Sequence, residues 1–282
     1  MKLIAFLLLP LIAAAAPKIA ETIQVAGTAI TIPAPPDSVA VIPAMKSVYA
    51  LQREFVPSMN ELLVGFIPAE SAADALADKI LLLSRSFSVQ TEKRVAKMNL
   101  SAKHFAELKK SISSQNEKLL KEVEKEMPGF VDKINRNVAK ETGFNMGFSL
   151  PQMTPLPPHE DTPRSLAYST LVRVDSTGAN GKIESALSMV TGTFVHVRGK
   201  ILFLYCNGGE KDLEWTRAIS KQWSQAILAA NPAEGDGPVT SFGGRSFGSR
   251  VLRGALIGAI VGAVIGLFRY FSSKRKPPEG GA

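Results

Sequence analysis

The stretch VRGKILFLYC, residues 197–206, decides the fold of this 282-residue chain. Its second part, 201–206, is a continuous apolar run, which is typical of a strand in the middle of a sheet. The preceding residues, 183–198, predict one long strand with a bulge near Gly192. Because Gly199-Lys200 supplies a turn between the two, the stretch predicts a hairpin at the centre of an antiparallel sheet.

An amphipathic helix is predicted directly after this hairpin. Asp212 is its candidate N-cap, and Asn231-Pro232 is its stop. Between them, apolar side chains recur at helical spacing along one face: Trp215, Ile219, Trp223, Ala226, Ile227 and Ala230. This stripe favours a helix that packs on the sheet, with Trp215, Ile219 and Trp223 in the structural core. An aromatic ligand site is the alternative.

Weaker patterns fill the remainder of the body. They predict a hairpin at 23–32, helices at 44–55 and 69–78, strands at 60–68, 79–90 and 166–174, a helical pair across 99–143, and a proline-rich loop or linker at 151–163. Together they predict an α+β fold, a mostly antiparallel sheet flanked by helices, plus one C-terminal transmembrane helix. The body, 16–232, is one domain or two lobes, 23–98 and 164–232, with a helical insertion at 99–143.

The order of these elements resembles that of the PsbP-like α/β sandwich proteins of exported compartments. An N-terminal hairpin ends in the proline-rich turn 33–37, helices and a strand meander follow, and VRGKILFLY leads into a closing helix with tryptophans. The resemblance covers residues 23–231 without a specific motif, and the insertion at 99–163 departs from it. It implies a protein that binds partners or assemblies, and it transfers no site residues.

The two ends of the chain predict export and membrane anchoring. Residues 1–15 contain a lysine, an apolar stretch and small residues before the cleavage position, as a secretory signal peptide does. Residues 233–250, rich in Gly and Ser, predict a flexible linker. An apolar run with arginines near its borders then predicts a transmembrane helix over 251–271, followed by a basic tail at 272–282 that we expect in the cytoplasm.

Four glycines recur at every fourth residue inside that apolar run, in GALIGAIVGAVIGLF, residues 254–268. They are Gly254, Gly258, Gly262 and Gly266. The repeat resembles glycine-zipper transmembrane helices, and small residues let two helices approach closely in lipid. These glycines are therefore the predicted helix–helix interface, whereas a plain anchor and a buried or interfacial segment are the alternatives.

The distribution of charge argues against nucleic acid as a partner. The net charge is +8, but seven basic residues and one acidic residue fall from residue 245 onward, and Lys2 adds one more positive charge. The body between them carries only about +1, which leaves no basic excess for phosphates. The single cysteine, Cys206, excludes an intrachain disulfide, and its apolar surroundings predict a buried structural role.

No catalytic motif accompanies these features. The sequence has no Gly-x-Ser-x-Gly elbow, His-Glu-x-x-His helix, P-loop or dinucleotide fingerprint. His159-Glu160-Asp161 has metal-ligand chemistry, but adjacent residues cannot all face one ion, so we expect neither metal nor cofactor. The other histidines, His104 and His196, occupy positions more typical of structural residues than of a general base.

These patterns favour a membrane-anchored extracytoplasmic, for example periplasmic, binding or scaffold module without catalysis. Its expected partners are the membrane, further copies of itself and an unidentified envelope protein. Two alternatives remain open. One is a membrane-anchored envelope enzyme such as a hydrolase, and the other is a self-assembling membrane protein that acts through its glycine zipper.

Replacing Gly258 and Gly262 together with isoleucine should sharply reduce association between anchors in a membrane. Isoleucine keeps the segment apolar, so the segment still inserts, but the branched side chains hold two helices apart. In-membrane crosslinking or a reporter of helix association measures the effect. Association that is absent in the wild type, or unchanged in the variant, would show that the segment is only an anchor.

Overall fold

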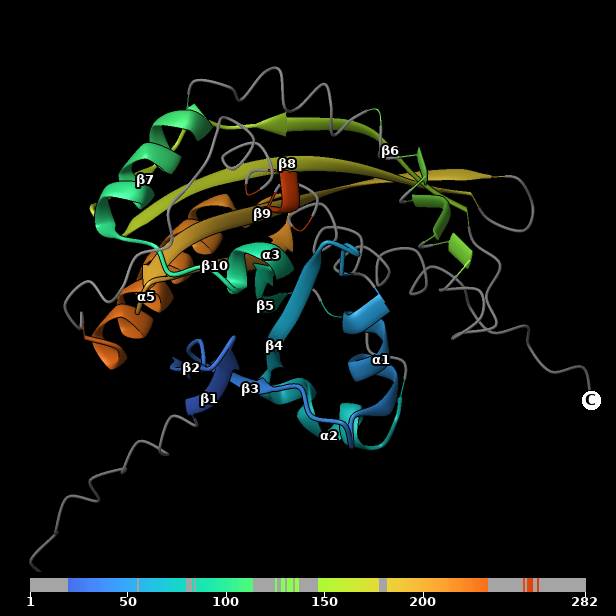
Figure 1. Ribbon diagram of the computed structural model, residues 1–282. Helices are drawn as coiled ribbons and strands as arrows, with labels where there is room; N and C mark the ends of the chain where they lie inside the picture. The colour runs from blue at the N-terminus through green and yellow to red at the C-terminus, as the bar shows by residue number, and fades with distance from the viewer. Residues whose placement is uncertain are drawn as a thin grey trace, which may run out of the picture.

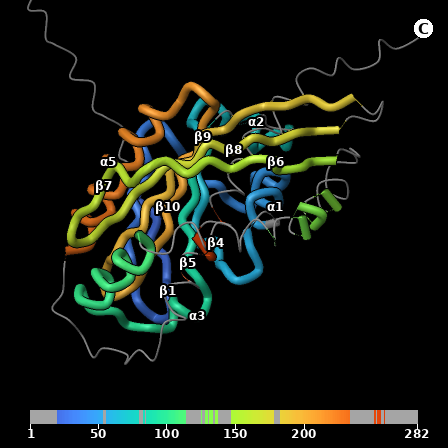
Figure 2. The backbone as a smooth tube through the Cα atoms, turned by 90° about the horizontal axis from the view of Figure 1, so that it is seen from above, coloured from blue at the N-terminus to red at the C-terminus, as the bar shows by residue number. Residues whose placement is uncertain are grey.

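The computed structural model describes residues 20–54, 56–79, 83, 85–113, 125, 128–129, 131–133, 135–136, 147–177, 182–232, 251, 253–255 and 258. These residues form an antiparallel sheet with helices against both faces (Figure 1, Figure 2). The predicted α+β class with a mostly antiparallel sheet is confirmed. The predicted signal peptide, linker and tail, and most of the predicted transmembrane segment, lie outside the described residues. Within the described part of the chain, no helix is long and apolar enough to cross a membrane.

Along the chain, an N-terminal hairpin is followed by strands that alternate with short helices, and then by consecutive strands that lead to a long helix. These elements are β1 (Ala20–Val25), β2 (Thr28–Pro33), β3 (Ser38–Ala40), α1 (Lys46–Glu54), β4 (Asn60–Pro68), η1 (Ala69–Ser71), α2 (Ala72–Leu76), β5 (Ser86–Glu92), α3 (Lys93–Ala96), β6 (Gly147–Pro155), β7 (Glu160–Asp161), β8 (Ser165–Thr177), β9 (Ile183–Val197), β10 (Lys200–Gly209) and α5 (Leu213–Ala230). Residues 102–113 are also helical. The described strands form the hairpin β1-β2 and one sheet ordered β3-β4-β5-β10-β9-β8-β6, with β7 beside β8.

The predicted central hairpin is β9-β10, and β10 lies between β9 and β5. Its turn is made by Arg198 and Gly199, whose φ angles of 49° and 74° fall in the left-handed region that glycine adopts easily. A second constraint acts on Gly199, since a Cβ there would lie 1.8 Å from Asn99 Oδ1. Glycine is therefore required at position 199 for two reasons, the left-handed backbone of the turn and the close packing of Asn99.

The bulge predicted near Gly192 is wrong. The register of β9 with both β8 and β10 passes through Gly192 without a shift. A Cβ on Gly192 would lie 3.6 Å from Cε1 of Tyr205, so the glycine sits directly under an aromatic ring. Among the described strands, register shifts occur instead in β4, between Leu62 and Val64, and in β6, between Ser149 and Gln152.

Two further predictions about the sheet need correction. Residues 151–155, predicted as a loop, complete β6, because an edge strand tolerates a proline where a register shift interrupts the ladder. The strand predicted at 79–90 begins only at Ser86, and Leu83 is instead buried in a small cluster with Val48 and Ile67. Both predicted lobes contribute strands to the same sheet, which they share through the pairing of β5 with β10.

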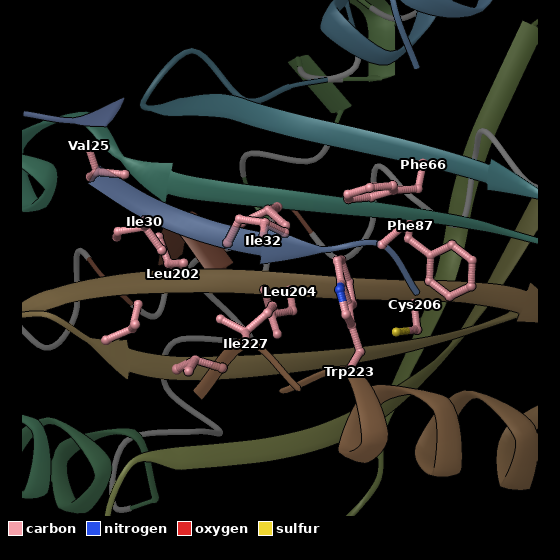
Figure 3. Close-up of a cluster of buried hydrophobic side chains, with 14 of the residues drawn as sticks. Val25, Ile30, Ile32, Phe66, Phe87, Leu202, Leu204, Cys206, Trp223 and Ile227 are labelled. Carbon is pink, nitrogen blue, oxygen red and sulfur yellow. The ribbon is translucent and has the colours of Figure 1, made fainter. Parts of the chain in front are cut away.

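Trp223 lies at the centre of the core between α5 and the sheet (Figure 3). Its side chain is 1% exposed, and its ring meets Phe66 and Phe87 at centroid distances of 5.7 and 5.8 Å. The indole Nε1 donates to the carbonyl of Pro33 at 2.8 Å, so the one polar atom of the ring is satisfied. Trp215 and Ile219 are partly buried and pack against the same cluster.

Asp212 occupies the predicted N-cap position, but its side chain does not cap α5. The carboxylate accepts from the Gly209 backbone N–H and from Arg85 Nη2, each at 2.9 Å. Burial alone would raise the pKa of Asp212, yet these hydrogen bonds outweigh it and hold the pKa below its usual value. The Arg85 guanidinium also lies 3.9 Å above the Trp215 ring, so this group joins β10, α5 and the chain before β5.

The face that α5 turns to β9 is partly polar, which the apolar stripe did not predict. Thr216 and Ser220 are completely buried there and form hydrogen bonds with Thr191 and Thr193 of β9. Short hydroxyl side chains that pair with one another let helix and sheet approach without leaving a polar group unsatisfied.

Trp223→Ala should lower the free energy of unfolding by about 3–5 kcal/mol, because it removes the largest side chain of the core and leaves a cavity. Chemical denaturation followed by circular dichroism measures the loss. Ile183→Ala serves as the control, since Ile183 is 63% exposed and its truncation should change stability little. Equal stability of Trp223→Ala and wild type would contradict the assigned core.

Candidate functional site

The sheet face opposite α5 carries the most distinctive group of buried polar side chains. Neighbouring residues of a strand point to opposite faces, so Phe87, Val89, Leu202 and Leu204 face α5 while the residues between them face away. On that opposite face, Phe105 of the 102–113 helical segment stacks on His196 with 5.4 Å between ring centroids. Beside it lie the described residues between 251 and 258, drawn as the short red segment near β4 and β5 in Figure 2.

Three side chains from three adjacent strands form the contact with this segment: Asn60 of β4, Gln90 of β5 and Tyr205 of β10. We call them the cradle. They are 2%, 2% and 1% exposed. The register places them together, because Asn60 is paired with Glu92, Gln90 with Phe203, and Tyr205 with Ser88. Residues far apart in the sequence thus meet on one patch of the sheet.

The cradle donates hydrogen bonds to the backbone of the segment. Asn60 Nδ2 donates to the carbonyl of Gly254 at 2.9 Å and to Gln90 Oε1 at 3.0 Å. Tyr205 Oη donates to the carbonyl of Ala255 at 2.9 Å. These bonds recognise main-chain carbonyls, so they require a backbone that comes close, and they do not depend on the side chains of the segment.

Two of the predicted interface glycines make this approach possible. A Cβ on Gly254 would lie 2.7 Å from Asn60 Oδ1, and a Cβ on Gly258 would lie 2.4 Å from Tyr205 Oη. Both distances are too short for a real side chain. The bare glycine face predicted to contact another helix therefore contacts the cradle, while Gly262 and Gly266 lie outside the described residues.

The cradle is uncharged at physiological pH. Burial raises the pKa of Tyr205 well above its usual value, with a further contribution from Tyr168, so the phenol remains a neutral donor. Asn60 Oδ1 is buried and has no hydrogen-bond partner among the described residues. One acceptor of the cradle is thus unused by the described residues of the segment, 253–255 and 258.

A pocket of about 390 Å³ opens next to the cradle, lined by Ser58, Met59, Glu92, Lys93, Arg94 and Arg253. Two of its charged side chains already form hydrogen bonds that stabilise the fold. Glu92 accepts from the backbone N–H groups of Arg94 and Val95 and so caps α3, and Lys93 Nζ donates to the carbonyl of Ser58. The pocket marks where residue 253 passes the end of β5, and its rim is basic.

The structure separates the three residues of the predicted metal-like cluster. Glu160 accepts a hydrogen bond from Ser165, and Asp161 forms an ion pair with Lys109. Both ring nitrogens of His159 are buried without a hydrogen-bond partner among the described residues. No three His, Cys, Asp or Glu side chains of the described residues gather as they would around a metal ion.

The remaining candidates occupy structural positions. Cys206 is fully buried on the α5 side, where burial raises the pKa of its thiol. His196 Nε2 forms a hydrogen bond with the carbonyl of Leu100, and His104 lies in the first turn after Ser101. Ser101 Oγ accepts from the His104 backbone N–H, which is the arrangement of a helix N-cap. None of these residues belongs to the cradle.

Lowering the pH from 6.5 to about 4 should destabilise the protein through His159. Burial, and then the charge of Arg217, lower the pKa of His159 from 6.5 to about 4, so in this range only the unfolded state takes up the proton. Below about pH 4 both states are protonated and this contribution stays constant. Urea unfolding of the wild type and of His159→Gln at several pH values should show a shallower pH dependence for the variant. Parallel profiles would contradict a shifted pKa.

The chain matches no model of a known protein family and no curated protein sequence. The cradle and its contacts are therefore the basis for assigning a function.

Proposed function

We propose that this protein is a membrane-anchored, extracytoplasmic binding or scaffold module that acts without catalysis. The observation that carries the proposal is the cradle, where Asn60 and Tyr205 donate to the backbone carbonyls of a glycine-rich apolar segment. This is the chemistry of holding a polypeptide. Amide and phenol donors fix a backbone, and close packing against glycines selects a segment with a bare face.

The properties of the cradle favour binding over a reaction. A general acid or base works best when its pKa is near the operating pH. The cradle offers two amides, which do not titrate, and a phenol whose pKa is raised well above its usual value. The acidic side chain next to it, Glu92, already caps α3. Each of these groups is suited to a stable contact.

Membrane anchoring is supported by the sequence of the two ends. A cleaved signal peptide at 1–15 would commit the body to export, and the apolar run at 251–271 would then stop transfer. The cluster Lys274-Arg275-Lys276 favours a cytoplasmic tail. The partners that follow are the membrane, an envelope protein, and further copies of the chain associated through Gly254, Gly258, Gly262 and Gly266.

Protease added to intact spheroplasts should degrade the body of the protein and leave a short protected C-terminal fragment. The reason is that the body lies outside the cytoplasmic membrane while the tail lies inside. Immunoblotting with tags on the two ends of the mature chain measures the outcome, and a cytoplasmic protein serves as the control for intact cells. Full protection of the body would contradict the topology.

A further inference from the structure

We propose that the cradle is a binding site for the glycine face of the chain's own C-terminal apolar segment, and that docking there competes with passage of this segment through a membrane. The competition between docking and membrane insertion rests on the proposed membrane anchoring. Docking of the segment on the cradle does not depend on that anchoring. The protein would then have two states, one with the segment on the sheet and one with the segment in lipid.

The fit between the two surfaces supports docking. Val251 and Ala255 are 0% and 3% exposed, and the two hydrogen bonds from Asn60 and Tyr205 reach consecutive carbonyls of the segment. The spacing of four residues brings Gly254 and Gly258 to the same side of a helix, and each lies over a cradle residue. The periodicity that suits contact between two membrane helices thus equally suits this sheet.

Length makes the two states mutually exclusive. When Gly254, Ala255 and Gly258 lie on the cradle, only residues 259–271 of the predicted transmembrane helix remain beyond it. These thirteen residues would span about 20 Å as a helix at about 1.5 Å per residue, whereas a hydrocarbon core is about 30 Å thick. A segment that occupies the cradle therefore cannot also cross the membrane.

The polar character of the cradle makes docking reversible. When the segment leaves, water can hydrate the side chains of Asn60, Gln90 and Tyr205, since all three carry hydrogen-bonding groups. A purely apolar patch of the same size would be costly to expose to water. Asn60 Oδ1, which has no hydrogen-bond partner among the described residues when the segment is docked, would also be open to water, and this lowers the free-energy cost of undocking.

The segment can reach the cradle within one chain. Nineteen peptide units separate Pro232, after α5, from Val251, and an extended chain of this length covers roughly 60 Å. Because the segment is tethered, its effective concentration at the cradle is high, and a weak contact suffices to populate the docked state.

A pair of introduced cysteines tests the docked state in the full-length protein. A Cβ at position 254 would lie 3.7 Å from Asn60 Cγ, so Gly254→Cys combined with Asn60→Cys places two thiols within reach of a disulfide. The native Cys206 is fully buried and will not interfere. We expect an intramolecular disulfide in mild detergent and a lower yield in membranes, where the segment spans the bilayer.

The control pair is Asn60→Cys with Ile183→Cys, which leaves Gly254 in place. His196 is paired with Ile201 near the cradle. Ile183 lies thirteen residues from His196 along β9, which is about 43 Å in an extended strand. This pair should give no intramolecular disulfide, because Cα atoms farther apart than about 7 Å cannot be bridged. Circular dichroism of each variant establishes that it is folded.

A second, milder variant separates docking from a general loss of structure. Tyr205→Phe keeps the ring against Gly192 and removes only the hydroxyl that donates to Ala255. The disulfide yield in the cysteine pair should therefore fall about fivefold, the effect of one net hydrogen bond. The melting temperature of the body should change little.

Three results would overturn the inference. They are folded Gly254→Cys/Asn60→Cys protein without an intramolecular disulfide in either medium, disulfides formed only between two chains, and equal intramolecular yields in detergent and in membranes. Protease accessibility of the same protein tests the topology independently. A protected body with an intact disulfide contradicts membrane anchoring alone, whereas an accessible body without the disulfide contradicts docking alone.

Discussion

The pairing of β5 with β10 is the contact on which the rest of the structure depends. It joins residues 86–90 to residues 203–207 and so unites the early strands β3, β4 and β5 with the later strands β10, β9, β8 and β6. Because side chains alternate along each strand, one face of the sheet carries the apolar core and the other face carries the cradle. Leu204 and Val89 belong to the same core cluster as Trp223, while Gln90 and Tyr205, one residue further along the same strands, belong to the cradle.

This division gives the two faces of the sheet different chemistry. The α5 side is closed by Trp223, whose only polar atom is satisfied, and by paired hydroxyls between α5 and β9. The opposite side keeps amide and phenol donors that can bond to a backbone or to water. A rigid core behind the sheet holds the cradle residues in place, which lowers the entropic cost of binding a segment there.

The sequence predicts the elements whose signal is local. The central hairpin and α5 were predictable because a long apolar run and a helical stripe identify them, and β4 has the predicted bounds. Strand β6 was missed because prolines argue against strands, although an edge position accommodates them. The cradle could not be predicted, since Asn60, Gln90 and Tyr205 are isolated polar residues in apolar strands and only the register brings them together.

The β1-β2 hairpin shows how the order of synthesis constrains this protein. Its backbone is held by the side chain of Asn231, which bonds both the N–H and the carbonyl of Thr31 across 200 residues of sequence, and by the indole of Trp223 at Pro33. The β1-β2 hairpin therefore cannot make these contacts before α5 has been synthesised. Because these contacts join residues about 200 positions apart, the attachment of the hairpin is expected to be a late step of folding.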